Sequence, residues 1–145
     1  MRIAVAVLGM LVLAGASSAA APMRARSQTP IAVPRGVLWL GPVYRGITAR
    51  ATRVRYEDGS AVKVDYQLLA VWNYSTFVPP PVVAGESTAV QTYPIRTGGT
   101  ARFYLGPHGS AVVEVEKDGR TAALVSRYAG KVDLVEASQL VRRKP

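Results

Sequence analysis

The 145-residue sequence contains no cysteine and a single histidine. Without cysteine there is no disulfide framework, no thiol nucleophile, no thiolate zinc site and no lipid-modified N-terminal cysteine. The nine acidic residues show no calcium-loop spacing, and no glycine-rich loop of the phosphate-binding kind is present. We therefore expect no catalytic residues, no metal site and no cofactor, and we expect that the protein is not an enzyme.

Long hydrophobic runs are also scarce, because the only one follows Arg2 and extends from Ile3 to Gly15. Thirteen residues of helix rise about 20 Å, against about 30 Å for the core of a bilayer. Small residues at Ser18 and Ala20 suit a signal-peptidase site. The pattern predicts a cleavable signal helix over residues 1–20, no transmembrane anchor in the mature chain, and a periplasmic or extracellular location. The alternative is an uncleaved helix that packs into the core.

Charge is distributed unevenly along the chain, whose formal net charge is +9. Residues 24–63 carry eight basic and two acidic groups, and residues 142–144 carry three basic groups and no acidic one. Such an asymmetry is informative about partners and solubility rather than about fold. We expect a flexible basic lead over residues 21–35, a single β domain over residues 36–141 and a basic tail over residues 142–145.

Short runs of β-branched and aromatic residues recur from residue 36 onward, separated by glycine and proline every eight to twelve residues. This spacing is typical of all-β domains. We expect a small antiparallel β-sandwich or barrel of about seven or eight strands, in which "KVDLVE" (131–136) is one of the strands. Outside the leader, only "VEASQLV" (135–141) suggests a helical turn.

Two hairpins are predicted at "EDG" and "KDG", each with a three-residue loop and with Gly59 or Gly119 at positive φ. The first register places Arg53, Arg55 and Lys63 together on a solvated face. The second places Glu116 opposite Arg120. Counting on through the next strand, Trp72 is expected on the inward face with Val62 and Val64.

Candidate binding residues come from the arginine alternation in "RATRVRY" and from two aromatic segments beside proline, "GVLWLGPVYRG" and "VWNYSTFVPPP". Basic and aromatic side chains are the groups that proteins use to contact anionic or extended partners. The ordinary alternatives are a solvated sheet face for the arginines and core packing for the aromatics. The candidates are Arg45, Arg50, Arg53, Arg55, Trp39, Tyr44 and Tyr74.

These features together favour an exported, non-enzymatic β-domain that acts as a binding or structural accessory protein of the cell envelope or secreted space. Its partner would be a protein or a polyanionic envelope component. An alternative is a single-strand nucleic-acid binder on a small barrel, with Arg50, Arg53 and Arg55 along the phosphates and Tyr44, Tyr56 or Trp39 stacked on bases; export argues against nucleic acid. A third interpretation is a small hydrolase that uses His108 with Ser110.

Overall fold

The computed structural model describes residues 27–75, 79–81, 83, 89–105, 110–126 and 130–145. Strands make up most of the described elements, which confirms the all-β class. In chain order the elements are β1 (Ser27–Ile31), β2 (Leu38–Trp39), β3 (Val43–Tyr44), β4 (Ile47–Thr48), β5 (Arg50–Tyr56), β6 (Gly59–Asp65), β7 (Ala70–Tyr74), β8 (Ala89–Pro94), β9 (Thr100–Leu105), β10 (Ala111–Lys117), β11 (Arg120–Val125), α1 (Lys131–Ser138) and β12 (Arg142–Arg143).

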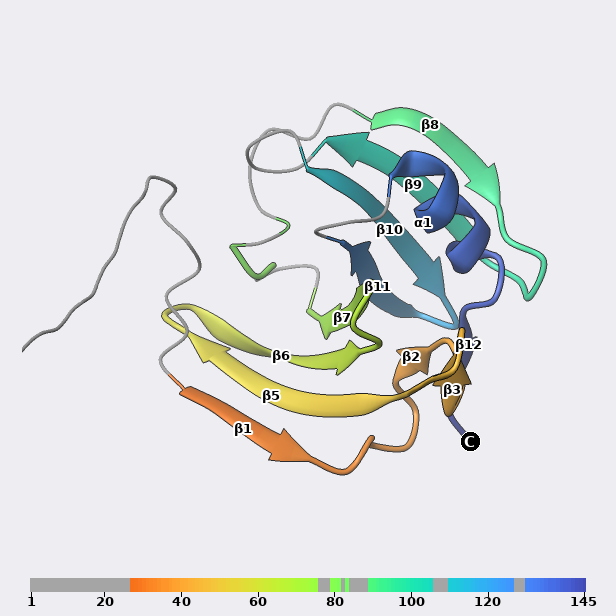
Figure 1. Cartoon of the computed structure of the whole chain (residues 1–145). Helices are drawn as coiled ribbons and strands as arrows, with labels where there is room; N and C mark the ends of the chain where they lie inside the picture. The colour runs from red at the N-terminus through yellow and green to blue at the C-terminus, as the bar shows by residue number, and fades with distance from the viewer. Residues whose placement is uncertain (1–26, 76–78, 82, 84–88, 106–109, 127–129) are drawn as a thin grey trace, which may run out of the picture.

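Eight of these strands form one antiparallel sheet in the order β1-β5-β6-β7-β11-β10-β9-β8. Figure 1 shows the sheet curving from β1 at the bottom of the view to β8 at the top. Its edge strands β1 and β8 do not pair with each other, so the described strands form an open sheet. The sequence predicts a sandwich of two sheets or a barrel. Instead, short elements cover one face of the single sheet.

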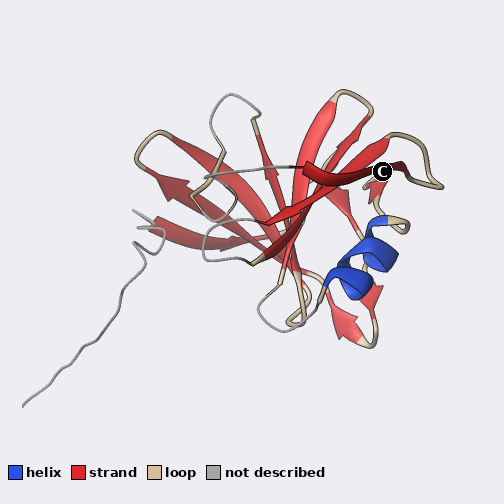
Figure 2. Cartoon of the chain, turned by 90° about the horizontal axis from the view of Figure 1, so that it is seen from above, coloured by secondary structure: helices blue, strands red, loops and turns tan. Residues whose placement is uncertain are grey.

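The core lies mainly between the sheet and the elements that cover it, α1, β2 and β12. Alternate residues of the central strands supply the sheet side of this core, and they are fully buried: Val64, Val71, Val113, Val115 and Leu124. Leu38 and Leu134 pack against them from β2 and α1. Figure 2 shows α1 on one side of the sheet. We call this side the helix face and the other side the opposite face.

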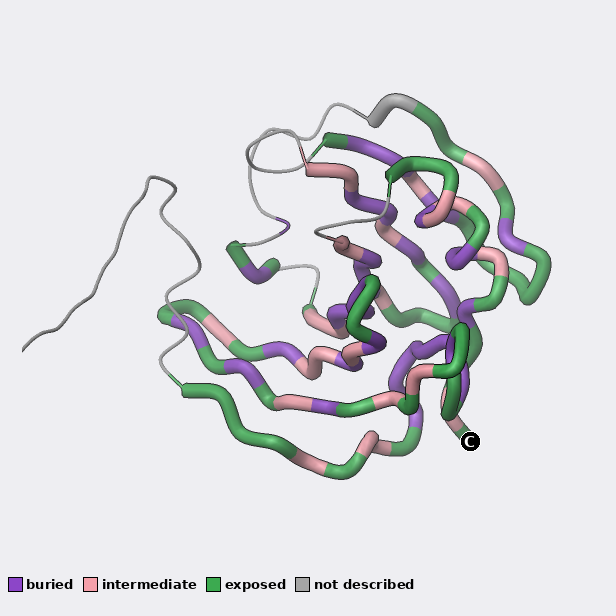
Figure 3. The backbone as a smooth tube through the Cα atoms, in the orientation of Figure 1, coloured by how far each residue is buried: buried purple, intermediate pink, exposed green. Residues whose placement is uncertain are grey.

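Two smaller apolar clusters lie on the opposite face, one around Trp72 and one around Tyr104. Figure 3 shows buried residues in both β5 and β6, and these belong to both faces: Val64 packs in the main core, whereas Val54 and Ala61 pack around Trp72. Because successive side chains of a strand point to opposite faces, one strand can contribute buried residues to both faces.

The segment "KVDLVE", predicted as a strand, lies in helix α1. Leu134, Ala137 and Ser138 are its buried residues, and their spacing is that of one face of a helix. Two β-branched valines hide this period in the sequence, because valine favours strands. Among the described residues, no helix has the length and apolar character required to cross a bilayer.

The predicted flexible lead is partly wrong, because Ser27–Ile31 forms edge strand β1. Ser27 lies opposite Arg55, and Ile31 lies opposite Ala51. Pro30 is compatible with an edge strand, where one side of the backbone needs no donor. The backbone of β5 thereby gains a second neighbour. Residues 21–26 and the predicted signal segment 1–20 lie outside the described residues.

Both predicted hairpin registers are wrong by one position, since the loops contain two residues each. Tyr56 lies opposite Gly59, and Lys117 lies opposite Arg120. Asp118 and Gly119 have φ values of +53° and +72°, as the favoured two-residue hairpin turn requires. The prediction for Gly119 is therefore confirmed, whereas Gly59 does not have a positive φ.

The β6–β7 connection also corrects a predicted face. A tight turn, in which the Leu69 carbonyl accepts the Tyr66 N–H at 2.9 Å, reverses the chain after Asp65. Val64 consequently lies opposite Val71, and Lys63 lies opposite Trp72. Trp72 is therefore on the opposite face, because the turn shifts the alternation by one residue.

Candidate functional site

Two polar side chains of the sheet hold β2 against the helix face. The Asn73 side chain accepts the Leu38 N–H at 2.8 Å and donates to the Leu38 carbonyl at 2.9 Å. The Tyr66 hydroxyl accepts the Leu40 N–H at 2.9 Å and donates to the Gly41 carbonyl at 2.8 Å. These contacts satisfy backbone groups of β2 and of the two residues that follow it, which the core would otherwise leave without partners. β2 is thereby fixed at one position over the sheet.

The C-terminal basic residues, for which the sequence predicts a tail over residues 142–145, pair with β2. Arg142 lies opposite Trp39, and Arg143 lies opposite Leu38. The Lys144 N–H donates to the Val37 carbonyl at 2.8 Å, and the Lys144 carbonyl accepts the Gly36 N–H at 2.8 Å. Three consecutive cations are therefore placed at fixed positions by backbone hydrogen bonds. Figure 1 shows β12 beside β2.

An open surface depression of about 460 Å³ lies beside this strand pair and includes Tyr44, Arg45, Glu136 and Arg142 in its lining. The Arg45 guanidinium lies 3.7 Å from Asp133 and 3.9 Å from Glu136, and it stacks 5.5 Å from the centre of the Tyr44 ring. The helix thus partly neutralises Arg45. Arg142 forms no ion pair with a described carboxylate.

The arginines of β5 are divided between the two faces of the sheet. Arg53 lies opposite Val62 on the helix face, and Arg55 follows on the same face. Arg50 lies opposite Asp65 and belongs to the opposite face. All three are exposed. The predicted grouping of Arg53 and Arg55 with Lys63 is wrong, because the shorter loop moves Lys63 to the other side.

Two of the candidate aromatics, Trp39 and Tyr44, are buried in the core. Trp39 and Tyr44 are 8% and 7% exposed, and the Tyr44 ring meets Tyr66 edge-on at 5.9 Å. The buried Nε1–H of Trp39 has no acceptor among the described residues, and the Lys144 ammonium lies 5.5 Å from the centre of its ring. The structure brings Trp39, Tyr44 and Arg45 together around β2, apart from Tyr74.

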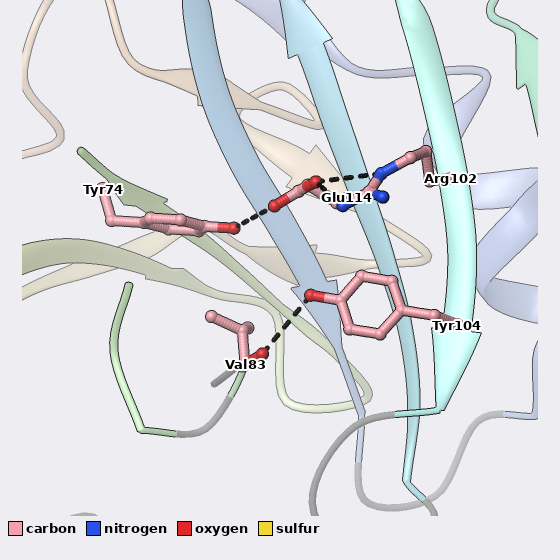
Figure 4. A network of polar contacts seen from close by, with 5 residues as sticks. All are labelled: Tyr74, Val83, Arg102, Tyr104 and Glu114. Atoms are coloured by element: carbon pink, nitrogen blue, oxygen red, sulfur yellow. Dashed lines mark hydrogen bonds and ion pairs between the residues drawn. The ribbon is translucent and has the colours of Figure 1, made fainter. Parts of the chain in front are cut away.

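Tyr74 belongs to a polar network on the opposite face, which Figure 4 shows. Its hydroxyl donates to Glu114 at 2.8 Å, and the other carboxylate oxygen of Glu114 accepts from Arg102 at 2.6 Å. The Tyr104 hydroxyl donates to the Val83 carbonyl at 3.4 Å. Each charge in the network has a partner, so the arrangement is typical of a structural cluster rather than of an activated nucleophile or base.

Burial dominates the acid–base behaviour of these tyrosines. Burial, the Glu114 charge and the hydrogen bond to Glu114 raise the pKa of Tyr74 well above its usual value. Burial, followed by the Glu114 charge, raises the pKa of Tyr104 to about 12. Burial also raises the pKa of Tyr66 to about 12. All three tyrosines are therefore neutral at physiological pH.

The domain is expected to lose stability as the pH rises from about 10 to about 12. An unfolded tyrosine ionises near pH 10, whereas Tyr66 and Tyr104 in the folded protein have pKa values near 12. The folded state therefore keeps its full stability below pH 10. It loses the contribution of these tyrosines as the pH rises from 10 through 12. The loss for Tyr104 should reach about 2 kcal/mol at pH 12. Urea unfolding between pH 9 and 12 measures it. A pH dependence in Tyr104→Phe as steep as in the wild type would contradict this assignment.

Sequence reasoning missed two pairings that involve Arg102 and Arg120. Arg102 pairs with Glu114 across β9 and β10, a match that follows only from the observed register. Glu116 lies opposite Thr121 rather than Arg120. The available signal was the "DG" pair at Asp118 and Gly119, which is typical of a two-residue loop and would have placed Lys117 opposite Arg120.

Three of the groups considered for catalysis or metal binding can be located relative to the described residues. The Glu114 carboxylate accepts hydrogen bonds from Tyr74 and Arg102. No cluster of three metal-ligating side chains occurs in the described part of the chain. His108 lies outside the described residues. Comparison with protein-family models, with curated proteins and with solved structures found no match.

Proposed function

We propose that the chain is an exported, non-enzymatic binding domain, an accessory protein of the cell envelope or secreted space that contacts a polyanionic partner. The leader pattern of residues 1–20 supports export, and the charge of +9 supports an anionic partner. The proposal places recognition on the helix face and the β2–β12 pair.

The observation that carries this proposal is the number of surface cations left without a carboxylate. Among the described basic residues, only Arg45, Lys63 and Arg102 form ion pairs. Arg53, Arg55, Arg120 and Arg143 are exposed and form none. A surface whose charges serve only solubility usually carries positive and negative residues interspersed. Unpaired cations of one sign instead attract polyanions by counterion release.

Among the described residues, the three aromatics proposed to stack on bases are buried, which does not favour the nucleic-acid alternative. Tyr44, Tyr56 and Trp39 are all less than 10% exposed, since their exposed fractions are 7%, 6% and 8%. Base stacking needs an accessible aromatic face. The burial of these three side chains, beside exposed arginines, favours recognition of charge over recognition of bases.

Binding of the mature protein to long-chain polyphosphate is expected to weaken log-linearly with increasing salt. Because Arg53 and Arg55 are solvated and separately placed, Arg53→Ala and Arg55→Ala should each reduce the slope by at most about one unit. Arg50→Ala, on the opposite face, is the matched control and should leave the slope unchanged. Fluorescence anisotropy across a salt series measures this. Absence of binding at physiological salt would refute the proposed function.

A further inference from the structure

Two guanidinium groups from distant parts of the chain lie against the same glycine. A Cβ built on Gly36 would be 3.2 Å from Nη2 of Arg120 and 3.7 Å from Nε of Arg143. Gly36 is buried and has a φ of +87°, a conformation that suits glycine. The missing side chain leaves room for both arginines to approach the backbone at one point.

The fold fixes both arginines by backbone pairing. Arg143 is held in β12 opposite Leu38, and Gly36 itself bonds to Lys144. Arg120 is the first residue of β11, directly after the rigid turn at Asp118 and Gly119. The guanidinium pair therefore belongs to a preorganised part of the molecule rather than to two free ends.

The cross-strand neighbour of Arg120 is another cation, although the turn before Arg120 also carries Asp118. Lys117 lies opposite Arg120 in the hairpin and is only 8% exposed; its ammonium donates to the carbonyls of Thr97 and Gly98. Neither Arg120 nor Arg143 forms an ion pair with a described carboxylate. Like charges placed opposite each other destabilise a sheet. The arrangement is favourable when an anion lies between the arginines.

We propose that Arg120 and Arg143 form a binding site for a tetrahedral oxyanion, the phosphate or sulfate group of an anionic ligand. Two planar guanidinium groups offer several donors in a fixed geometry, which matches an anion with at least three acceptor oxygens. This site rests on the proposed function and identifies where one charged group of the polyanion binds.

The position of Arg55 explains how a polymer would extend from this site. The register places Arg55 on the helix face, and β6 and β7 separate β5 from β11. Three strand spacings correspond to about 14 Å. A chain that carries repeated anionic groups can therefore contact the arginine pair and then the β5 arginines on the same face.

Thermal unfolding of the full mature protein tests the site with inorganic phosphate and with sulfate, at constant ionic strength against sodium chloride. We expect each oxyanion to raise the wild-type Tm above the value in chloride. Without oxyanion, Arg120→Gln and Arg143→Gln should melt at or above the wild-type temperature, because each removes one repelling charge. In phosphate the order should reverse. Arg50→Gln, on the opposite face, should respond like the wild type.

A purely structural role gives a different result, namely the same loss of Tm with and without phosphate. That result would overturn the site, as would an equal phosphate response in wild type and both arginine variants. Titration calorimetry with phosphate gives a second measurement, in which each variant should bind at least tenfold more weakly than wild type. If wild-type protein binds polyphosphate and both variants bind it equally well, the site is wrong while the proposed function stands.

Discussion

Replacing Asn73 with alanine is expected to lower the free energy of unfolding by about 2–5 kcal/mol. The substitution removes both side-chain partners of Leu38, whose N–H and carbonyl bond to the Asn73 amide at 2.8 and 2.9 Å. Leu38 is fully buried, so water cannot replace these bonds without opening the core. Each buried backbone group left without a partner costs about 1–3 kcal/mol.

Urea unfolding monitored by circular dichroism measures this loss. Gln91→Ala is the control, because Gln91 is an exposed amide on edge strand β8, and its loss should cost less than about 0.5 kcal/mol. Since Asn73 positions β2 and β2 pairs with β12, phosphate binding to Asn73→Ala should also weaken. A loss of stability below about 1 kcal/mol would show that β2 does not depend on this amide.

Replacing Gly99 with alanine is expected to cost about 2–4 kcal/mol, from backbone strain and from overpacking. Gly99 has a φ of +100°. A Cβ there would overlap the Glu116 carbonyl oxygen and would lie 3.1 Å from Cβ of Lys117. The obstructing atoms belong to the neighbouring strand β10 and cannot turn aside. The alanine must therefore separate the start of β9 from β10 or distort the turn before it.

Gly119→Ala separates the two contributions to this cost. Gly119 also has a positive φ, +72°, but a Cβ there would have no atom within 4 Å. It should lose only the conformational preference, about 1 kcal/mol. The difference between the two melting curves measures the effect of close approach. Equal losses in both variants would mean that β9 and β10 can move apart at little cost.

Several features of the fold could be predicted from local sequence. Short runs of β-branched and aromatic residues, separated by glycine and proline every eight to twelve residues, predicted the all-β class. The "DG" pairs predicted a positive φ at both Gly59 and Gly119, and the observed backbone confirms it at Gly119 only. The absence of cysteine excludes disulfides, and the composition determines the net charge of +9.

The faces of the arginines could not be predicted with the same reliability, because each depends on a loop length. One residue fewer in the first hairpin places Arg53 opposite Val62, and the turn before Ala70 moves Trp72 away from Val64. A register change of one residue exchanges the two faces of a strand. Local propensity favours several loop lengths about equally, so packing of the whole sheet selects among them.

The sequence by itself determined the strand content, the positive φ of Gly119 and the excess of cations, since these depend on neighbouring residues and on composition. Only the tertiary structure decided that Arg143 meets Arg120 at Gly36, and that Asn73 holds Leu38. Those contacts join residues far apart in the chain and require the register of several strands at once. Their formation depends on the free energy of the complete core, which no short segment specifies.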